Sequence, residues 1–411
     1  SQQKQVKLQF DYQPGQSIDL NARNTILHIE TWEQSQVELV ATFTYKGEKS
    51  SSKLEEFIEE FPENVRANVE ETPTVLRIKT FRSVPSKVKI GWQDFAVFNL
   101  SFSEEEIEIK YQLKVPRQAP LRVVHSYRDM QILGKLDFLQ LEQYSGDLRT
   151  QDLREAKLYL KYGKAQVGRI NTGLLNLYEN DTEIAQLGKL KATIKYSELR
   201  CPKVESMQLI AYESEFYIEQ AQDVQGELKY SRWDGALLQN LMVSTYECKF
   251  QVQNGGRWQF SSSKYSKYSL GALEGIGFQE SYEDKLSLQS IGDLKSPSCK
   301  YFKHQIGTLN GDYVVEAYEG QLRIDALSAG PGKIDLKGKY TDMLINSGQE
   351  PFRLEADLNY GKVSLPRQKG GSREVESKSN HTKAKMQTAN YQKGKGFFIL
   401  VNGYETDLQI L

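Results

Sequence analysis

The chain has 411 residues, enough for two or three ordinary domains or for one array of repeats with an added unit. Its 53 basic and 54 acidic residues leave a net charge of −1, which argues against an electrostatic grip on nucleic acid or on an anionic membrane. Hydrophobic residues make up 39% of the chain, and 23 residues are tyrosine, a composition that suits thin layers better than a thick core. No apolar run is long enough to span a membrane as a helix.

The first residues and the cysteines indicate an exported protein without a disulfide framework. The chain opens on the polar stretch SQQKQ, with no initiator Met and no basic or apolar signal region. We therefore expect a mature chain whose export signal was removed, located in the periplasm, at the outer membrane or outside the cell. Cys201, Cys248 and Cys299 are too few and too dispersed for disulfide bonding, so they are predicted to be packing residues.

Residues 1–118 are predicted to form a small β unit that carries one helix. Four stretches alternate between apolar and polar residues, as half-buried strands do; they cover 6–12, 17–20, 26–32 and 37–45. A helix is predicted at about 51–61, because four apolar residues share one helical face and Ser52 and Glu55 have the spacing of a capping box. Pro62 is expected to help end it. Further strands are predicted at 75–81, 88–92, 95–102 and 107–115, before the segment VPRQAP at 115–120 marks the domain boundary.

From residue 119 to residue 411 the chain is predicted to be a β-solenoid, because tyrosines recur at a regular interval. Between Tyr144 and Tyr246 a longer step alternates strictly with a shorter one, and the average step is about 17 residues, the signature of a repeat architecture. The series comprises Tyr127, Tyr144, Tyr162, Tyr178, Tyr196, Tyr212, Tyr230, Tyr246, Tyr265, Tyr282, Tyr301, Tyr318, Tyr340 and Tyr360.

Two kinds of repeat alternate along this series. In the first, Lys precedes the tyrosine, as in Lys161-Tyr162, and strand alternation gives that ring the direction of the core residues Leu158 and Leu160. In the second, Glu follows the tyrosine. Where an apolar residue directly precedes it, as at Tyr178, Tyr212 and Tyr318, alternation points the ring to the opposite side unless a bulge intervenes. The second kind contains Tyr178-Glu179, Tyr212-Glu213, Tyr246-Glu247, Tyr282-Glu283 and Tyr318-Glu319.

Charge decides the length of one coil. If one coil held two repeats, the glutamates would stack directly on one another, which is unfavourable on a sheet. If one coil holds a single repeat, the Lys-Tyr and Tyr-Glu repeats interleave and the charges alternate. We therefore predict parallel coils of about 17 residues whose ends need caps. At the C-terminal end a polar hairpin loop at 367–385 is followed by closing strands at 384–391 and 396–411.

The stretch ILHIETWEQSQVELVATFTY, the helix, the Val-Pro boundary and the Lys-Tyr-Ser and Tyr-Glu strands together resemble a bacterial family. It is the "putative adhesin", or auto-transporter-adhesin head-like, domain family of Gram-negative bacteria, whose function is unknown. The resemblance covers most of the chain and implies an exported β-solenoid with an adhesin-like role and no catalytic residues. Thr25 stands where such sequences usually have Gly, so we expect that turn to differ.

Enzymatic signatures are weak. The four histidines include no pair with ligand spacing, no G-x-S-x-G motif occurs, and we predict no catalytic residue, no metal and no cofactor. A carbohydrate-active β-solenoid, a lyase or a glycosidase, is the alternative, because Glu179, Glu213, Glu247 and Glu283 could line up on one face. Repeated identical acids suit a charge ladder better, since a catalytic pair needs two different environments.

The function predicted from the sequence is thus a non-enzymatic, exported, adhesin-like or surface-associated structural protein. Its partner would be a glycan or another surface protein, and exposed tyrosines would make the contact, because aromatic faces stack on sugar rings and on apolar surfaces. Packing of both tyrosine sets as ladders at the corners of the coils is the structural alternative. The candidate binding residues are those of the Tyr-Glu repeat, Tyr178, Tyr212, Tyr246, Tyr282 and Tyr318.

Overall fold

The protein is an all-β solenoid of stacked parallel coils, as predicted, with one described helix. The computed structural model describes residues 2–47, 52–80, 107–367 and 370–411. These form two compact units, residues 1–201 and residues 202–411, and the division falls inside β13 (Glu198–Tyr212). The strands predicted at 88–92 and 95–102 lie outside the described residues.

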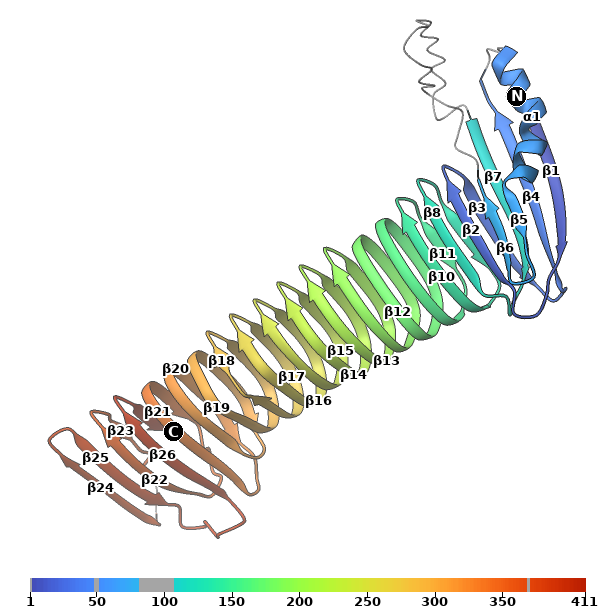
Figure 1. Cartoon of the computed structure of the whole chain (residues 1–411). Coiled ribbons are helices and arrows are strands. Elements are labelled where there is room, and N and C mark those ends of the chain that lie inside the picture. Colours follow the sequence, from blue (N-terminus) through green and yellow to red (C-terminus); the bar gives the residue numbers. More distant parts are fainter. Residues whose placement is uncertain (1, 48–51, 81–106, 368–369) are drawn as a thin grey trace, which may run out of the picture. The chain divides into compact units, whose positions relative to one another are not determined.

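In the first unit, strands and a helix at the N-terminal end extend both faces of the first coil (Figure 1). One face continues through β3 to β7, β4 and β1, and the other continues from β2 to the hairpin of β6 and β5. These strands are β1 (Gln2–Asp11), β2 (Ser17–Arg23), β3 (Ile26–Trp32), β4 (Gln36–Tyr45), β5 (Val69–Glu71), β6 (Val75–Lys79) and β7 (Ile107–Pro116).

The helix α1 (Ser52–Ala67) covers this end and continues past the predicted stop. Pro62 lies inside the helix, so the prediction that it helps end the helix was wrong. The apolar face explains the difference: Phe61 and Val65 are both buried, and Phe61 packs against Phe43 of β4 with ring centroids 5.8 Å apart. Burial of one further turn outweighs the backbone hydrogen bond that a proline removes.

The remaining strands of the first unit form coils of the predicted length. Leu136 pairs with Leu153 and Leu148 pairs with Ala165, so each coil takes up about 17 residues. The N-terminal strands β2 and β3 also pair in parallel with β8 and β9, so residues 17–32 form a coil of their own. The strands are β8 (Leu121–Ser126), β9 (Met130–Leu133), β10 (Leu136–Tyr144), β11 (Leu148–Thr150) and β12 (Leu153–Lys195).

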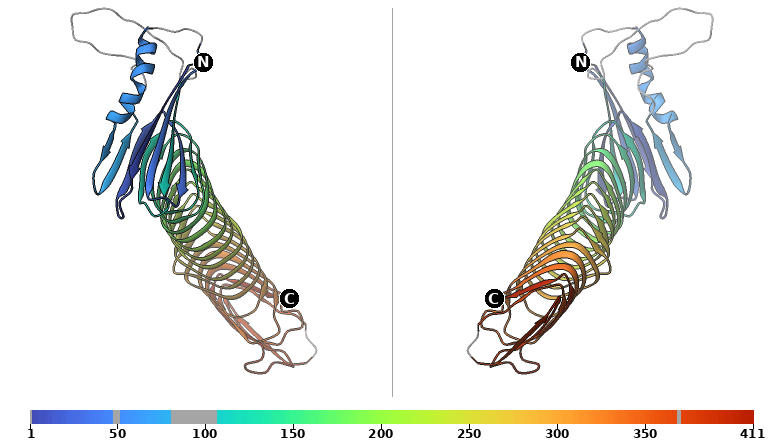
Figure 2. Two further views of the ribbon diagram at one scale, coloured as in Figure 1. Left: turned by 90° about the vertical axis from the view of Figure 1, so that its right-hand side faces the viewer. Right: turned by 90° about the vertical axis from the view of Figure 1, so that its left-hand side faces the viewer.

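In the second unit the coils begin at the same length and then grow. Phe216 pairs with Trp233 in the first of these coils, whereas Tyr313 pairs with Ile334 near the C-terminal end, so the coil lengthens from about 17 to about 21 residues. Figure 2 shows the coils from two further sides. The strands are β14 (Glu215–Lys229), β15 (Arg232–Tyr246), β16 (Lys249–Lys264), β17 (Lys267–Phe278), β18 (Ser281–Tyr282), β19 (Lys285–Leu309), β20 (Tyr313–Leu327) and β21 (Gly332–Ile345).

At the C-terminal end the chain folds back on itself. The last strands, β26 (Phe397–Tyr404) and β27 (Asp407–Ile410), insert between β21 and the coil formed by β22 (Phe352–Asn359) and β23 (Val363–Ser364). The polar segment predicted as a hairpin loop forms an antiparallel hairpin of two strands, which pairs with β22 and ends the stack. Its strands are β24 (Ser372–Lys378) and β25 (His381–Gln387).

Candidate functional site

Each coil turns one corner through three successive residues, which we call the pre-corner, corner and post-corner residues. The corner residue has a positive φ, for example +53° at Tyr196 and +51° at Glu247. This left-handed conformation is uncommon outside glycine, and it turns the strand sharply enough to begin the next face. Asn24, with φ of +52°, makes the same corner in the coil of β2 and β3, and it is followed there by Thr25.

The two kinds of repeat are two ways of building this corner. In the Lys-Tyr repeat the tyrosine is the corner residue, whereas in the Tyr-Glu repeat the tyrosine is the pre-corner residue and the glutamate takes the positive φ. The register places them in successive coils, with Lys229 beside Tyr246 and Tyr246 beside Lys264. The repeats therefore interleave, as the sequence predicts from charge alternation.

All these tyrosines lie on the outside of the corner, in what we call the tyrosine edge. The prediction that Tyr162 points the same way as Leu158 and Leu160 was wrong, because its φ of +58° breaks the strand alternation on which the prediction relied. Tyr162 is 39% exposed, whereas both leucines are buried. Tyr178 follows its buried neighbour Leu177 and lies outside, as alternation predicts.

Within each unit neighbouring rings of the tyrosine edge pack edge to face, except Tyr360 and Tyr404, which are tilted. Ring centroids of neighbouring tyrosines are 5.1–5.8 Å apart from Tyr127 to Tyr196 and from Tyr212 to Tyr340. Each such pair contributes about 0.5–1.5 kcal/mol beyond its buried area. The edge consists of Tyr127, Tyr144, Tyr162, Tyr178 and Tyr196 in the first unit, and of Tyr212, Tyr230, Tyr246, Tyr265, Tyr282, Tyr301, Tyr318, Tyr340, Tyr360 and Tyr404 in the second.

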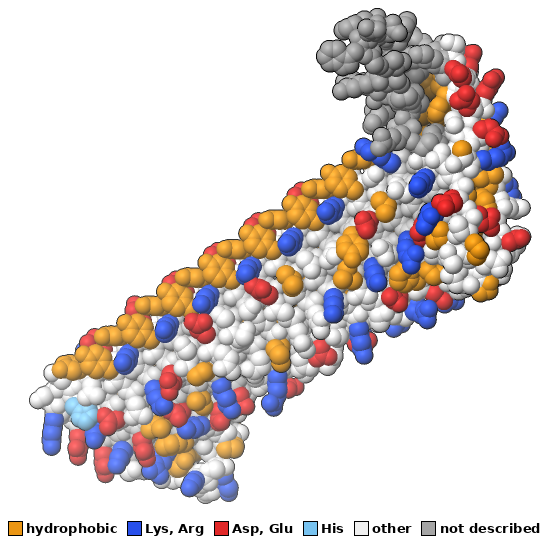
Figure 3. All heavy atoms as spheres, viewed as in Figure 1, with side chains coloured by type: hydrophobic (Ala, Val, Ile, Leu, Met, Phe, Trp, Pro, Cys, Tyr) orange, Lys and Arg blue, Asp and Glu red, His pale blue; other side chains and the backbone are white. Residues whose placement is uncertain are grey.

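Charged side chains border the rings on both sides. In Figure 3 basic side chains follow one side of the line of hydrophobic side chains and acidic side chains follow the other. The sequence supplies both rows, since pre-corner lysines alternate with pre-corner tyrosines and corner glutamates alternate with corner tyrosines. Partial desolvation, and then the charge of neighbouring Tyr230 and Glu247, raises the pKa of Tyr246, so its hydroxyl stays protonated and can donate a hydrogen bond.

The predicted candidates are less exposed than their neighbours. Tyr178, Tyr212, Tyr246 and Tyr282 are half-buried, and Tyr318 is 37% exposed. The corner tyrosines of the Lys-Tyr repeat are more open than these candidates, for example Tyr196 at 42% and Tyr230 at 41%. The corner glutamates Glu179, Glu213, Glu247 and Glu283 are exposed and border the edge in alternate coils.

Beneath the tyrosine edge, small polar post-corner residues are buried and hydrogen-bonded. The Ser266 hydroxyl donates to the carbonyl oxygen of Lys264 at 3.1 Å and accepts from the backbone N–H of Cys248 at 3.1 Å. Its own backbone N–H donates to a carboxylate oxygen of Asp284 at 2.8 Å. Since buried polar backbone groups need partners, these side chains hold the sharp corner in place.

Replacing Ser266 with Ala is expected to lower the free energy of unfolding by about 1–3 kcal/mol, because the buried N–H of Cys248 loses its acceptor. Urea unfolding followed by circular dichroism measures the change. Ser269→Ala, on an exposed position of the same coil, is the control and should stay within about 0.5 kcal/mol of the unmodified protein. Equal losses in both variants would contradict a structural role for the post-corner hydroxyl.

A buried cysteine and a buried histidine form the other group of side chains whose types are common in catalytic sites. The Cys299 Sγ lies 4.0 Å from Nε2 of His304, and His304 Nδ1 shares a hydrogen bond of 3.0 Å with the Tyr313 hydroxyl. Burial raises the pKa of the Cys299 thiol to about 12 and lowers the pKa of His304 to about 3. The thiol stays protonated and closed to solvent, so this pair packs the core and is no nucleophile. Cys201 and Cys248 are also buried, and neither forms a disulfide bond with a described residue, as predicted for packing residues.

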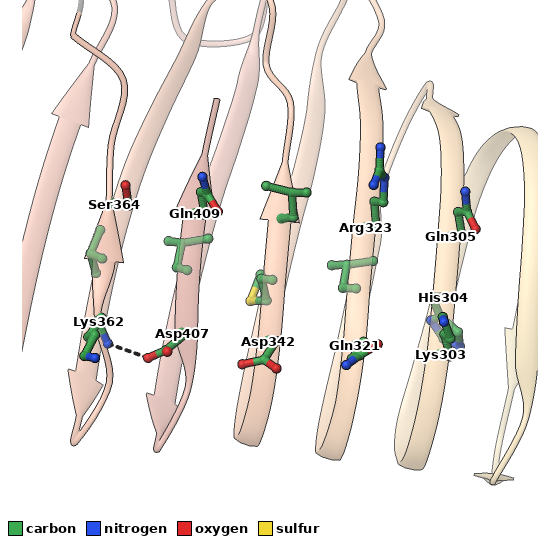
Figure 4. A pocket seen from close by; sticks show the side chains of 15 residues that line it. Lys303, His304, Gln305, Gln321, Arg323, Asp342, Lys362, Ser364, Asp407 and Gln409 are labelled. Atoms are coloured by element: carbon green, nitrogen blue, oxygen red, sulfur yellow. Dashed lines mark hydrogen bonds between the residues drawn. The ribbon is translucent and has the colours of Figure 1, made fainter.

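A polar groove of about 850 Å³ opens on the outer surface of the C-terminal coils in the second unit. Two rows of outward side chains form its walls, and Figure 4 shows them crossing neighbouring strands. The floor consists of buried or half-buried residues, such as Leu322 and Leu408. The row nearer the tyrosine edge contains Lys303, Gln321, Asp342, Asp407 and Lys362, and the other contains Gln305, Arg323, Leu344, Gln409 and Ser364.

Sequence reasoning missed this groove and its two neighbouring carboxylates. Asp342 and Asp407 are register partners on β21 and β27, so their Cα atoms are about 4.8 Å apart. Both belong to the same wall of the groove, and one Asp407 oxygen accepts the backbone N–H of Lys362 at 2.8 Å. A glycosidase places its two carboxyl groups on either side of the bond that it cleaves. Two acids on one wall suit the binding of a chain better than its cleavage.

Within residues 2–47, 52–80, 107–367 and 370–411, no group of three or more His, Cys, Asp or Glu side chains is arranged to hold a metal ion. The helix of this part, α1, is neither long enough nor apolar enough to cross a membrane.

Comparison with known proteins shows a weak likeness to a solved structure. No family model matches the chain, and no curated protein matches it. A solved structure described as a "putative cell adhesion protein" from Clostridium sporogenes aligns over 99% of both chains with 10% sequence identity. Its TM-score of 0.18 does not show a shared arrangement of the coils.

Proposed function

We propose that this chain is a non-enzymatic, adhesin-like recognition scaffold that presents the tyrosine edge to a partner protein. The observation that carries the proposal is the line of partly exposed rings at a fixed spacing, with most corner rings 39–44% exposed. Tyrosine is enriched in protein interfaces because it offers a large, stiff contact area and a hydrogen-bonding hydroxyl at little entropic cost. Neighbouring rings hold each other in place, so little conformational freedom is lost on binding.

The charges beside the rings favour a protein over a polyelectrolyte. Lysines on one side and glutamates on the other each recur in every second coil, about 9.6 Å apart. A polyanion attracted by the lysines would meet the glutamates within a few ångströms, and a polycation would meet the lysines. A protein surface with both charges can match both rows, which gives orientation and register to the contact.

The proposal includes export and a location in the periplasm, at the outer membrane or outside the cell. A carbohydrate-active enzyme is the second candidate, and the neighbouring Asp342 and Asp407 in the groove are the observation that favours it. Both lie on one wall, so the binding function ranks first.

The test compares binding of the unmodified protein with that of a Tyr178→Ala, Tyr212→Ala and Tyr246→Ala triple variant. Arrays of glycans and of extracellular-matrix proteins, including collagen, fibronectin and mucin, serve as probes. We expect binding to a protein on the array and a loss of about tenfold or more in the variant, because each ring supplies a contact worth about 1 kcal/mol or more.

Two controls separate recognition from stability in this test. Ile210→Ala and Met242→Ala remove apolar side chains that are 54% and 60% exposed outside the tyrosine edge, and they should bind as the unmodified protein does. Circular dichroism and thermal unfolding confirm that the triple variant is folded. Binding that survives in a folded triple variant, or no binding of the unmodified protein to any protein probe, would contradict the proposal.

A further inference from the structure

The polar groove on the C-terminal coils is a second surface feature, and it is separate from the tyrosine edge. Its walls cross β19, β20, β21, β27 and β23, which lie side by side in this order. Four steps of about 4.8 Å make the groove about 19 Å long, the length of a short extended polymer. Its volume of about 850 Å³ is in the range of small-molecule and oligomer sites.

Several polar side chains of the groove are exposed and lack partners within the described part of the chain. The amides of Gln305, Gln321 and Gln409 and the carboxylate of Asp342 form no side-chain hydrogen bond to any described residue. On β15 the same two rows are closed, because Arg232 Nε donates to Asp234 at 2.6 Å and its Nη2 donates to Gln251 at 2.7 Å. The exposed amides of the groove have no such partner among the described residues.

The order of charges in the groove indicates a neutral ligand. Along the wall nearer the tyrosine edge the two acids, Asp342 and Asp407, occupy adjacent coils, and the lysines Lys303 and Lys362 lie at the two ends. A polyanion would meet both carboxylates at the centre, and a polycation would meet a lysine at each end. A neutral chain that carries many hydroxyl groups avoids both conflicts and can form hydrogen bonds with the polar wall residues.

Amides and carboxylates are well suited to hydroxyl-rich chains. A glutamine side chain donates and accepts in one plane, and a carboxylate accepts at two oxygens, so each can bind two neighbouring hydroxyl groups of a sugar ring. Such polar groups repeat at every coil, and an extended sugar chain offers hydroxyl groups at a similar repeat. The outward side chains that face the groove include a single apolar one among the described residues, Leu344, so apolar pockets for peptide side chains are lacking.

We propose that this groove binds an extended, neutral oligosaccharide along the stack, with Gln321, Gln409 and Asp342 as the principal hydrogen-bonding residues. The bound chain stays intact, because Asp342 and Asp407 lie on one wall and do not flank a glycosidic bond. The proposal does not depend on the tyrosine edge, so the two surfaces can bind two different partners.

Isothermal titration calorimetry with linear hexasaccharides of glucose, mannose and N-acetylglucosamine tests the proposal. We expect at least one to bind the full chain, and a Gln321→Ala, Gln409→Ala double variant to bind it about tenfold more weakly or worse. Gln251→Ala changes a glutamine of β16 that accepts a hydrogen bond from Arg232 outside the groove, and it should bind as the unmodified protein does. Both glutamines of the double variant are exposed, so circular dichroism should show an unchanged fold.

Each outcome of this experiment decides something. No heat with any of the hexasaccharides overturns the proposal, and so does binding that the double variant retains in full. Binding that is lost in the tyrosine triple variant and kept in the glutamine double variant moves the sugar to the tyrosine edge and also overturns it. Shortened oligosaccharides in mass spectrometry of the titrated mixture would show that the bound sugar is cleaved. This result would contradict the non-enzymatic part of the proposed function, while the groove would remain the binding site.

Discussion

Acidification from pH 6.5 to about pH 3 is expected to lower the free energy of unfolding of residues 202–411 by roughly 4–5 kcal/mol. The cause is one buried imidazole, that of His304. Burial lowers its pKa to about 3 in the folded protein, while the unfolded chain keeps the ordinary value of 6.5. A group whose pKa is depressed on folding stabilises the protein above its unfolded pKa, and that stability is lost as the pH falls. The loss is about 1.4 kcal/mol for each pH unit below 6.5.

The surroundings of His304 explain why no compensating charge appears. The groups that face its ring are the Tyr313 hydroxyl, the Cys299 thiol and the Phe302 ring, whose centroid is 4.7 Å away. All three are neutral, so a protonated imidazole would be an unpaired charge in the core. Asp284, whose pKa burial raises, works in the opposite direction as it takes up a proton near the acid end, and it offsets part of the loss.

A double variant isolates the histidine. His304→Leu with Tyr313→Phe removes both partners of the hydrogen bond, and leucine fits because Leu322 is the register partner of His304 in the next coil. Urea unfolding at several pH values, followed by the fluorescence of the buried Trp233 and Trp258, measures the free energy. The double variant should gain on the unmodified protein by about 1.4 kcal/mol for each pH unit below 6.5. Tyr313→Phe alone keeps the histidine and should keep the slope, so parallel profiles of the double variant and the unmodified protein would contradict the prediction.

The repeat architecture could be predicted from the sequence because its signals are local and are copied many times. The alternation of a longer and a shorter step between tyrosines, together with the repulsion of stacked glutamates, was sufficient for the length of the coil. The direction of the Lys-Tyr rings was not predictable in the same way. Alternation assumes extended backbone at every residue, and a tyrosine with φ of +58°, such as Tyr162, breaks that assumption although the residue itself is not glycine.

The groove was beyond prediction for a different reason, which is the order of the strands. Its central residues Asp342 and Asp407 are far apart in sequence and become neighbours because the last strands insert between β21 and the coil of β22 and β23. No repeat spacing signals this insertion, because strands 352–359 and 363–364 come first along the chain. In the same way, Pro62 lies inside α1 because of packing against β4, which a local rule for helix ends does not include.

The coils also approach each other so closely that a single methyl group is expected to disrupt them. Gly226→Ala should lower the free energy of unfolding by roughly 3 kcal/mol or more. Gly226 has a φ of +139°, a conformation that costs an alanine about 1–3 kcal/mol. The added Cβ would also overlap the carbonyl oxygen of Leu209, which is backbone and cannot rotate away. Gly173, with φ of +147° against the Ala156 carbonyl, repeats this arrangement in the first unit.

Gly275→Ala is the matched control, since it makes the same chemical change on the same stack. Gly275 has no positive φ, and its added Cβ would lie 3.4 Å from the Asp293 carbonyl oxygen, an ordinary contact. Because alanine restricts the unfolded chain more than glycine does, this variant is expected to gain about 0.4–1 kcal/mol. Urea unfolding of both variants measures the difference, which should reach about 3.5 kcal/mol. Equal stabilities would show that neighbouring coils can separate to admit a side chain. The tight stacking that holds the tyrosine edge and the groove in register would then not be required for the stability of the fold.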